Sequence, residues 1–272
     1  MINRFKKAIY LYVFMGFFLA HAGSYEDFFQ AVKKDDAATV LALLTRGFDP
    51  NTLGPEGVTG LFMAARSGSG KVAGVLLWAP VTDVEFRNAA DESPLMLAAL
   101  RGDLAMAQAL IARDADVNKT GWAPLHYAAS RGHVAMIDLL LEHHAYIDAE
   151  SPNGTTPLMM AAGYGSVQAT RVLLRAGADA TGKNAEGLTA LDVALGFAKP
   201  DSANALRAAA ATSQAQSGAT RGAASPSTTR SKTRRAAPVR RARPPVLRRL
   251  ACAANCPPAH LEVAAAGPEA RV

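Results

Sequence analysis

The fold is decided by the stretch GWAPLHYAASRGHVAMIDLLLEHHAYIDA, residues 121–149. Pro124 stands where the first turn of a helix tolerates a missing N–H group, and Gly132 is typical of a residue that ends a helix. The apolar residues that follow share helical spacing along one stripe: Val134, Ile137, Leu140 and Leu141. The stretch therefore predicts two short antiparallel helices.

This pattern recurs along the chain. Five phrases of seven residues are alike: TGLFMAA from Thr59, SPLMLAA from Ser93, APLHYAA from Ala123, TPLMMAA from Thr156 and TALDVAL from Thr189. The intervals between their shared leucines are 34, 30, 33 and 33 residues, at Leu61, Leu95, Leu125, Leu158 and Leu191. A near-constant period of this size indicates a stacked repeat array, in which no unit buries its apolar face alone. Function is then expected on a surface rather than in one pocket.

The phrase and the residues after it resemble the ankyrin repeat family, whose pattern is TPLHxAAxxGHxxxVxxLLxxGADVN. Gly132-His133, Ala115-Asp116-Val117-Asn118 and Gly177-Ala178-Asp179-Ala180 fit this pattern in register. The resemblance implies an all-α solenoid of helix-turn-helix units joined by connecting loops, which we call fingers. Six units are expected, including a degenerate first one, at about 25–54, 55–89, 90–120, 121–152, 153–185 and 186–211.

The chain departs from the family pattern in the TPLH phrase. Only His126 keeps the histidine, and the other units carry Phe62, Met96, Met159 and Asp192 there. We therefore expect apolar packing between those units in place of polar cross-links.

The fourth unit has two further departures. Ala123 stands where Ser or Thr would cap the helix, a loss of about 1 kcal/mol. The short interval before this unit removes residues from the finger around Lys119, Thr120 and Gly121, which predicts a notch in the binding edge. In the last unit, Lys199-Pro200-Asp201 between the two helices indicates a cap.

Residues 1–22 have the organisation of a signal peptide. A basic start is followed by the apolar run Ala8–Leu19 and by Ala20-His21-Ala22, which fits the A-x-A cleavage rule. The run is shorter than the about 20 apolar residues normally needed to span a membrane. We expect cleavage after Ala22 and a periplasmic or secreted protein, with an uncleaved anchor as the alternative.

Residues 212–272 differ from the rest in composition. They are rich in Ala, Arg, Pro, Ser and Thr, cannot bury a core and are expected to form a disordered tail. They hold 11 of the 29 Lys and Arg but only two acidic residues, a net charge of +9. The whole chain carries +6, so the repeat domain without the signal segment carries −6.

Three interpretations of this tail stay open. In the first it contacts nucleic acid or an anionic membrane electrostatically, and in the second it folds back on the acidic repeats. In the third it is an extension without function, of the kind that a GC-rich gene yields when it is read past a frameshift. The expected export argues against nucleic acid.

The sequence offers no pattern for catalysis or for a cofactor. Ser67–Lys71 resembles a phosphate loop, but Ala65 and Val72 replace the first Gly and the final Ser or Thr. Neither GxSxG nor HExxH occurs. We therefore expect no enzyme, with no catalytic residue and no cofactor.

Two groups of potential metal ligands occur, and neither is expected to bind metal. The first is a set of four histidines in the fourth unit, where two stand at positions of structural His in the family: His126, His133, His143 and His144. The second lies in the tail, a poor setting for a closed site: Cys252, Cys256 and His260.

Ankyrin proteins bind partners along a concave face, and the resemblance implies three sets of positions here. The residues before each phrase are Val58, Glu92, Trp122, Thr155 and Leu188. The ends of the first helices are Arg66, Ser67, Leu100, Arg101, Ser130, Arg131, Gly163 and Tyr164. The finger tips are Pro55, Glu56, Arg87, Asn88, Lys119, Ser151, Asn153 and Asn184.

Five of these residues are the predicted partner-binding site, because Trp, Tyr and Arg dominate binding hot spots: Arg66, Arg101, Trp122, Arg131 and Tyr164. The alternative is that Trp122 packs over the finger of its neighbour and that the arginines form a solvated face.

We therefore expect a non-enzymatic scaffold for a protein partner. It is similar to small exported bacterial ankyrin proteins, some of which support an enzyme of oxidative-stress protection. The alternative is an immunity protein or a secreted effector that acts by protein binding. No nucleic-acid partner is expected, membrane contact only through an uncleaved signal segment, and the chain is expected to be a monomer.

Overall fold

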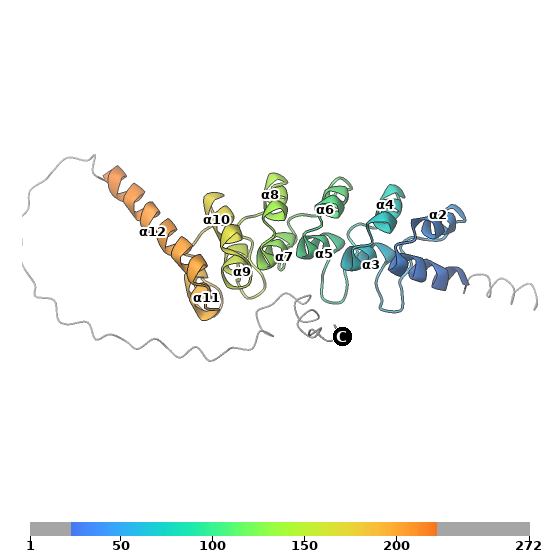
Figure 1. Ribbon diagram of the computed structural model, residues 1–272, viewed down its shortest axis with the longest axis horizontal. Helices are drawn as coiled ribbons and strands as arrows, with labels where there is room; N and C mark the ends of the chain where they lie inside the picture. Colours follow the sequence, from blue (N-terminus) through green and yellow to red (C-terminus); the bar gives the residue numbers. More distant parts are fainter. Residues whose placement is uncertain (1–22, 222–272) are drawn as a thin grey trace, which may run out of the picture.

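Short helices stack in two rows along residues 23–221, the part of the chain that the computed structural model describes (Figure 1). The predicted signal peptide at 1–22 and the predicted tail from 222 onward lie outside the described residues. The inner row contains α3 (Gly60–Ser67), α5 (Pro94–Arg101), α7 (Pro124–Arg131), α9 (Pro157–Gly163) and α11 (Ala190–Gly196). The outer row contains α2 (Ala37–Thr45), α4 (Gly70–Trp78), α6 (Leu104–Ile111), α8 (Val134–Glu142), α10 (Val167–Arg175) and α12 (Pro200–Arg221).

The repeated phrase begins each inner helix, and in every unit but that of α7 its first residue caps the helix. The hydroxyls of Thr59, Ser93 and Thr156 each accept a hydrogen bond from a backbone N–H of the first turn, at 3.3 Å. Ala123 of α7 makes no such bond, so the predicted loss of this cap is confirmed. Instead, Nδ1 of His126 accepts the N–H of Ala123 at 3.1 Å, which satisfies one donor at this terminus.

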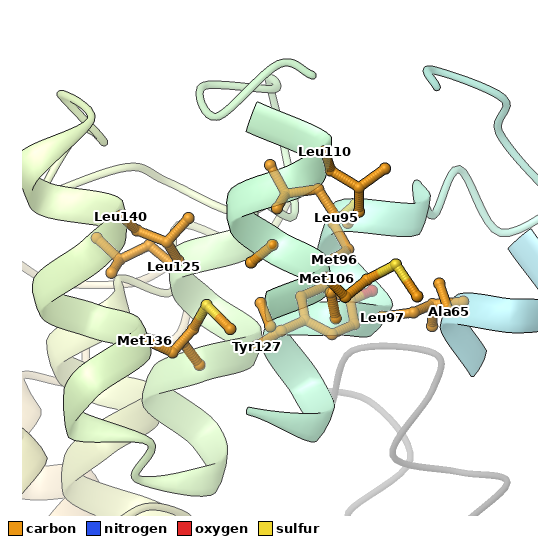
Figure 2. Packing of buried hydrophobic residues seen from close by; sticks show 14 of the residues in the cluster. Ala65, Leu95, Met96, Leu97, Met106, Leu110, Leu125, Tyr127, Met136 and Leu140 are labelled. Atoms are coloured by element: carbon orange, nitrogen blue, oxygen red, sulfur yellow. The ribbon is translucent and has the colours of Figure 1, made fainter. Parts of the chain in front are cut away.

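Leucines close the core within each helix pair. Leu95 of α5 lies beside Leu110 of α6, and Leu125 of α7 lies beside Leu140 of α8 (Figure 2); all four are at most 1% exposed. Pairs of alanines on the inner helices, such as Ala128-Ala129, are fully buried and allow neighbouring inner helices to approach closely. The stack therefore holds one continuous apolar core.

The first unit is a helix pair, as the sequence predicts. Residues 23–34 are helical and α2 is its outer helix. The core here is aromatic: Phe28 stacks on Phe48 at 4.5 Å between ring centroids and meets Phe29 edge-on at 5.1 Å. These rings cover the end of the array that has no preceding unit.

The last unit is built as a cap. Asp192 is exposed, whereas the equivalent residues of the other units are buried, because no further unit covers α11. Likewise Leu195 is 49% exposed at a position where Ala65, Ala99 and Ala129 are covered by the next inner helix. The outer helix α12 continues to Arg221, into the segment where the sequence predicts the start of the tail.

One residue of each finger clamps the backbone of the next finger. Nδ2 of Asn51 donates to the carbonyl of Val81 at 2.8 Å, and Nδ2 of Asn118 donates to that of His144 at 2.8 Å. A carboxylate of Asp148 similarly accepts the N–H of Asp179 at 2.9 Å. Successive fingers are therefore linked as a ladder along the array.

Candidate protein-binding surface

The finger before α7 differs from the other fingers in how it closes. Four fingers end in a turn whose carbonyl acceptor is the residue before the phrase, at 2.8 to 3.1 Å: Val58, Glu92, Thr155 and Leu188. Within the described residues, the carbonyl of Trp122 accepts no such bond. The connection from α6 to α7 spans only 112–123, against 79–93 before α5 and 143–156 before α9. In Figure 1 the connections into α3 and α5 project as loops below the inner row. The shortened finger before α7 is thus confirmed, and the notch in the binding edge stays a prediction.

Several positions that the resemblance assigns to the binding face are buried. Val58, Glu92 and Thr155 are each 5% exposed, so their prediction as contact residues is wrong. Ser151 and Asn184, predicted as finger tips, are 4% and 7% exposed. The reason is local, because these residues close the turns of their own fingers: Ser151 Oγ, for example, accepts the N–H of Thr155 at 2.9 Å.

Trp122 is half-buried in the shortened finger before α7. Its ring meets the imidazole of His126 edge-on, with 5.3 Å between centroids and 78° between planes. Trp122 thus packs on the core with one part of its ring and leaves another part accessible to solvent. A rigid, partly exposed indole of this kind is suited to binding.

His126 is a structural residue that joins two units. It is fully buried, and because its Nδ1 accepts from Ala123, the proton lies on Nε2, which donates to the carbonyl of Thr155 at 2.9 Å. Burial lowers the pKa of His126 to about 4, so the ring is neutral at pH 7. Phe62, Met96 and Met159 are buried at the same position of their units, so the predicted apolar packing is confirmed there, but it is wrong for Asp192, which is exposed.

Tyr127 joins the same unit to the preceding one. It is fully buried, and its hydroxyl donates to Oε1 of Glu92 at 3.0 Å, while Nδ2 of Asn88 donates to Oε2 at 2.9 Å. Burial, together with the nearby carboxylate of Glu92, raises the pKa of Tyr127. The sequence reasoning missed this pair, although Tyr127 stands where α5 and α9 carry Leu97 and Met160.

The predicted arginines differ in how strongly the protein holds them. Arg66 forms an ion pair with Glu56, and Nη1 of Arg101 donates to the carbonyl of Arg66 at 3.2 Å, where its guanidinium lies over Gly68. Arg131 is exposed and makes no hydrogen bond or ion pair with any residue in the described part of the chain. Leu100 stands in α5 where Arg66 stands in α3, and its carbonyl already binds Nε2 of His133 at 3.1 Å. Arg131 therefore does not repeat the bond that Arg101 makes to Arg66.

Tyr164 is half-buried and lies against a residue that the sequence reasoning did not select. The centroid of its ring is 4.5 Å from the ring centroid of Phe197, a residue that is 42% exposed. Phe197 follows Leu191 by the same number of residues as Arg131 follows Leu125, a spacing that could have identified it. The five predicted residues therefore lie on four successive units, with Trp122 and Arg131 on the same one, and Phe197 extends this series by one unit.

Two other residues stand out on the outer side of the array. Trp78, at the end of α4, is 78% exposed, and no sequence pattern singled it out. Arg113 donates to the carbonyls of Leu77 and, at 3.1 Å, Pro80, so it caps the C-terminus of α4 from the next unit. Arg113 is thus a structural residue.

The described residues contain no group of three or more His, Cys, Asp or Glu side chains placed to hold a metal ion. Cys252 and Cys256 lie outside the part that the structure describes. Among the described helices, none combines the length and apolar character needed to cross a bilayer.

Comparison with protein families agrees with this architecture. A family model described as ankyrin repeats in three copies matches residues 73–151, and another, described as ankyrin repeats in many copies, matches residues 140–194. Residues 73–194 therefore match ankyrin repeats, a family that is generally a non-enzymatic scaffold for protein partners. No curated protein matches the chain. The first unit, helix α3 and helix α12 lie outside the matched residues, and the structure shows that they continue the stack.

Proposed function

We propose that the chain is a non-enzymatic scaffold that binds one protein partner along the ends of its inner helices and across the notch before α7. The observation that carries this proposal is the state of the two ends of α7. Trp122, at the start, is held by the core and partly accessible, and Arg131, at the end, is exposed and free of partners among the described residues. Tryptophan and arginine are the residue types that most often dominate binding energy.

The proposal includes export. Its support is the basic start, apolar run and A-x-A motif of residues 1–22. A mature protein that begins at Gly23 in the periplasmic or secreted fraction would establish it, and an intact Met1 in the cytoplasmic fraction would contradict it. An exported partner enzyme, such as one of oxidative-stress protection, then follows from the resemblance to small exported ankyrin proteins.

Affinity purification from the periplasmic fraction tests the binding surface. A protein recovered with the wild-type chain should be lost, or strongly reduced, with Trp122→Ala and with Arg131→Ala. Trp78→Ala and Arg171→Ala are matched controls, because both change the same residue types on outer helices, at exposed positions. Recovery that is unchanged by the α7 variants would refute the proposed surface, and far-UV circular dichroism would show that each variant is folded.

A further inference from the structure

We propose that the ends of the inner helices recognise a peptide segment that carries a carboxylate and, a few residues away, a large apolar side chain. This inference rests on the proposed function and adds the chemistry of the partner. It concerns five residues, which we call the inner-helix row: Ser67, Arg101, Arg131, Tyr164 and Phe197.

The inner-helix row is a line of equivalent positions. Each member follows the shared leucine of its phrase by the same number of residues, and the inner helices that carry them stack directly on one another. Packed helices have axes about 8–10 Å apart, so neighbouring members of the row are separated by about one such step. A linear partner can therefore contact several members at once.

The chemistry of the row changes along the array. Both arginines are exposed, but Arg101 donates to the carbonyl of Arg66, whereas the side chain of Arg131 has no partner among the described residues. A guanidinium in this state offers paired N–H donors that fit a carboxylate. Arg131 is therefore the member of the row that can accept a charged group without breaking an existing contact.

The following two members are aromatic. The rings of Tyr164 and Phe197 pack against each other with 4.5 Å between their centroids, and Phe197 remains 42% exposed. Because the two rings support each other, they present an apolar surface of fixed shape, which suits an aromatic or large aliphatic side chain. A carboxylate on Arg131 and an apolar group on these rings are thus complementary to the row.

The spacing of the row sets the register of such a partner. An extended chain rises about 3.3 Å per residue, so one step along the array corresponds to about three residues. Tyr164 is one unit from Arg131 and Phe197 is two units from it. The carboxylate and the apolar side chain are therefore expected about three to six residues apart.

The charge of the repeat domain favours a peptide over a polyanion. The repeats carry a net charge of −6 without the signal segment, so a nucleic acid or an anionic membrane would be repelled by the domain as a whole. A single carboxylate at Arg131 is attracted by the guanidinium beside it. The acidic residues of the repeats repel it only weakly, because charges more than about 10 Å away are screened.

Selection of random peptides displayed on phage, with the full chain as bait, tests the inference. The wild-type chain should enrich peptides with Asp or Glu about three to six positions from an aromatic or large aliphatic residue. With Arg131→Glu the acidic residue should disappear from the enriched sequences, and with Phe197→Ala the apolar residue should disappear. Arg171→Glu makes the same charge change on the exposed face of α10 and should leave the selection unchanged.

Fluorescence anisotropy of one enriched, labelled peptide gives the magnitude. Arg131→Glu should weaken its binding about tenfold or more, and Arg171→Glu less than about twofold. Enriched peptides without acidic residues, or equal binding by Arg131→Glu, would overturn the inference. If no peptide is enriched while the affinity purification still yields a partner sensitive to Trp122, the inference fails and the proposed function stands; if both experiments fail, both are wrong.

Discussion

The inner helices α5 and α7 occupy equivalent places in the array and bury their equivalent residues to the same depth, yet they do so with different chemistry. Met96 and Leu97 of α5 are 0% and 3% exposed, and His126 and Tyr127 of α7 are both fully buried. The α5 pair holds its neighbours by packing alone. The α7 pair also bonds forward to Thr155 and back to Glu92.

The difference coincides with the shortened finger before α7. The finger that leads into α5 closes with a bond from Asn88 to the carbonyl of Glu92, and the finger that leads into α7 has no equivalent bond among the described residues. His126 and Tyr127 supply directional links to the neighbouring units at the place where the finger supplies fewer. We infer that polar burial in α7 offsets the short finger and holds Trp122 and Arg131 at fixed positions.

The largest expected effect is a loss of stability at low pH that comes from His126 of α7 and has no source in α5. The folded-state pKa of His126 is about 4 and the ordinary value is 6.5, so below pH 6.5 the unfolded chain takes up a proton that the folded chain does not. The stability from the neutral ring is therefore present above pH 6.5 and is lost as the pH falls toward 4. This loss amounts to roughly 3 kcal/mol.

Urea unfolding at pH 7 and at pH 4, followed by circular dichroism, measures this loss. His126→Met, which copies α5, should remove about that much of the pH dependence. His143→Gln changes an exposed histidine and should leave the dependence as it is in the wild type. If His126→Met retains the full pH dependence, the buried ring is not its source.

The next effect comes from the second polar residue of α7. Tyr127→Phe keeps the ring but removes the donor to Glu92, leaving a buried carboxylate oxygen with one partner fewer. We expect the free energy of unfolding at pH 7 to fall by about 2 kcal/mol. Tyr146→Phe makes the same change at a residue that is 67% exposed and should cost less than about 0.5 kcal/mol. Equal effects of the two variants would show that the Glu92 bond contributes nothing.

The sequence predicts the array well because the array is built from local rules that repeat. The phrase with its capping residue, the alanine pair and the apolar stripe are each contained within one unit, and each appears in the structure where the pattern places it. The lost cap at Ala123 and the shortened finger before α7 were also predictable, because both are departures from that local pattern.

The surface is less predictable because exposure depends on contacts between units. Glu92 is charged and was expected on the surface, but its partner Tyr127 lies 35 residues away and draws it inward. Arg101 and Arg131 occupy the same position in their helices and are both exposed, and only the neighbouring units show that Arg101 forms a hydrogen bond and Arg131 does not. Their difference depends on which side chain satisfies the preceding carbonyl, and a family pattern does not record that choice.

A smaller effect is expected from restoring the cap that α5 has and α7 lacks. Ala123→Ser places a hydroxyl where Ser93 accepts the N–H of Met96, in a site that is equally buried. The free energy of unfolding should rise by about 1 kcal/mol, and Ser93→Ala should lower it by a similar amount. Thermal or urea unfolding of both variants checks this. A destabilised Ala123→Ser would mean that Nδ1 of His126 already fills the place of the cap.

The smallest effect is expected at the end of the array, beyond the last residues that pack on the repeats. Burial is described for α12 up to Thr212, and the buried residues in that part of the helix are Ser202, Ala203 and Leu206, all before Ala211. Truncation after Ala211 should therefore lower the free energy of unfolding by less than about 0.5 kcal/mol, which urea unfolding would record as a nearly unchanged midpoint. A large drop would show that later residues pack on the repeats. It would also favour the interpretation in which the basic tail folds back on the acidic domain, because a solvated tail adds no contact that unfolding could remove.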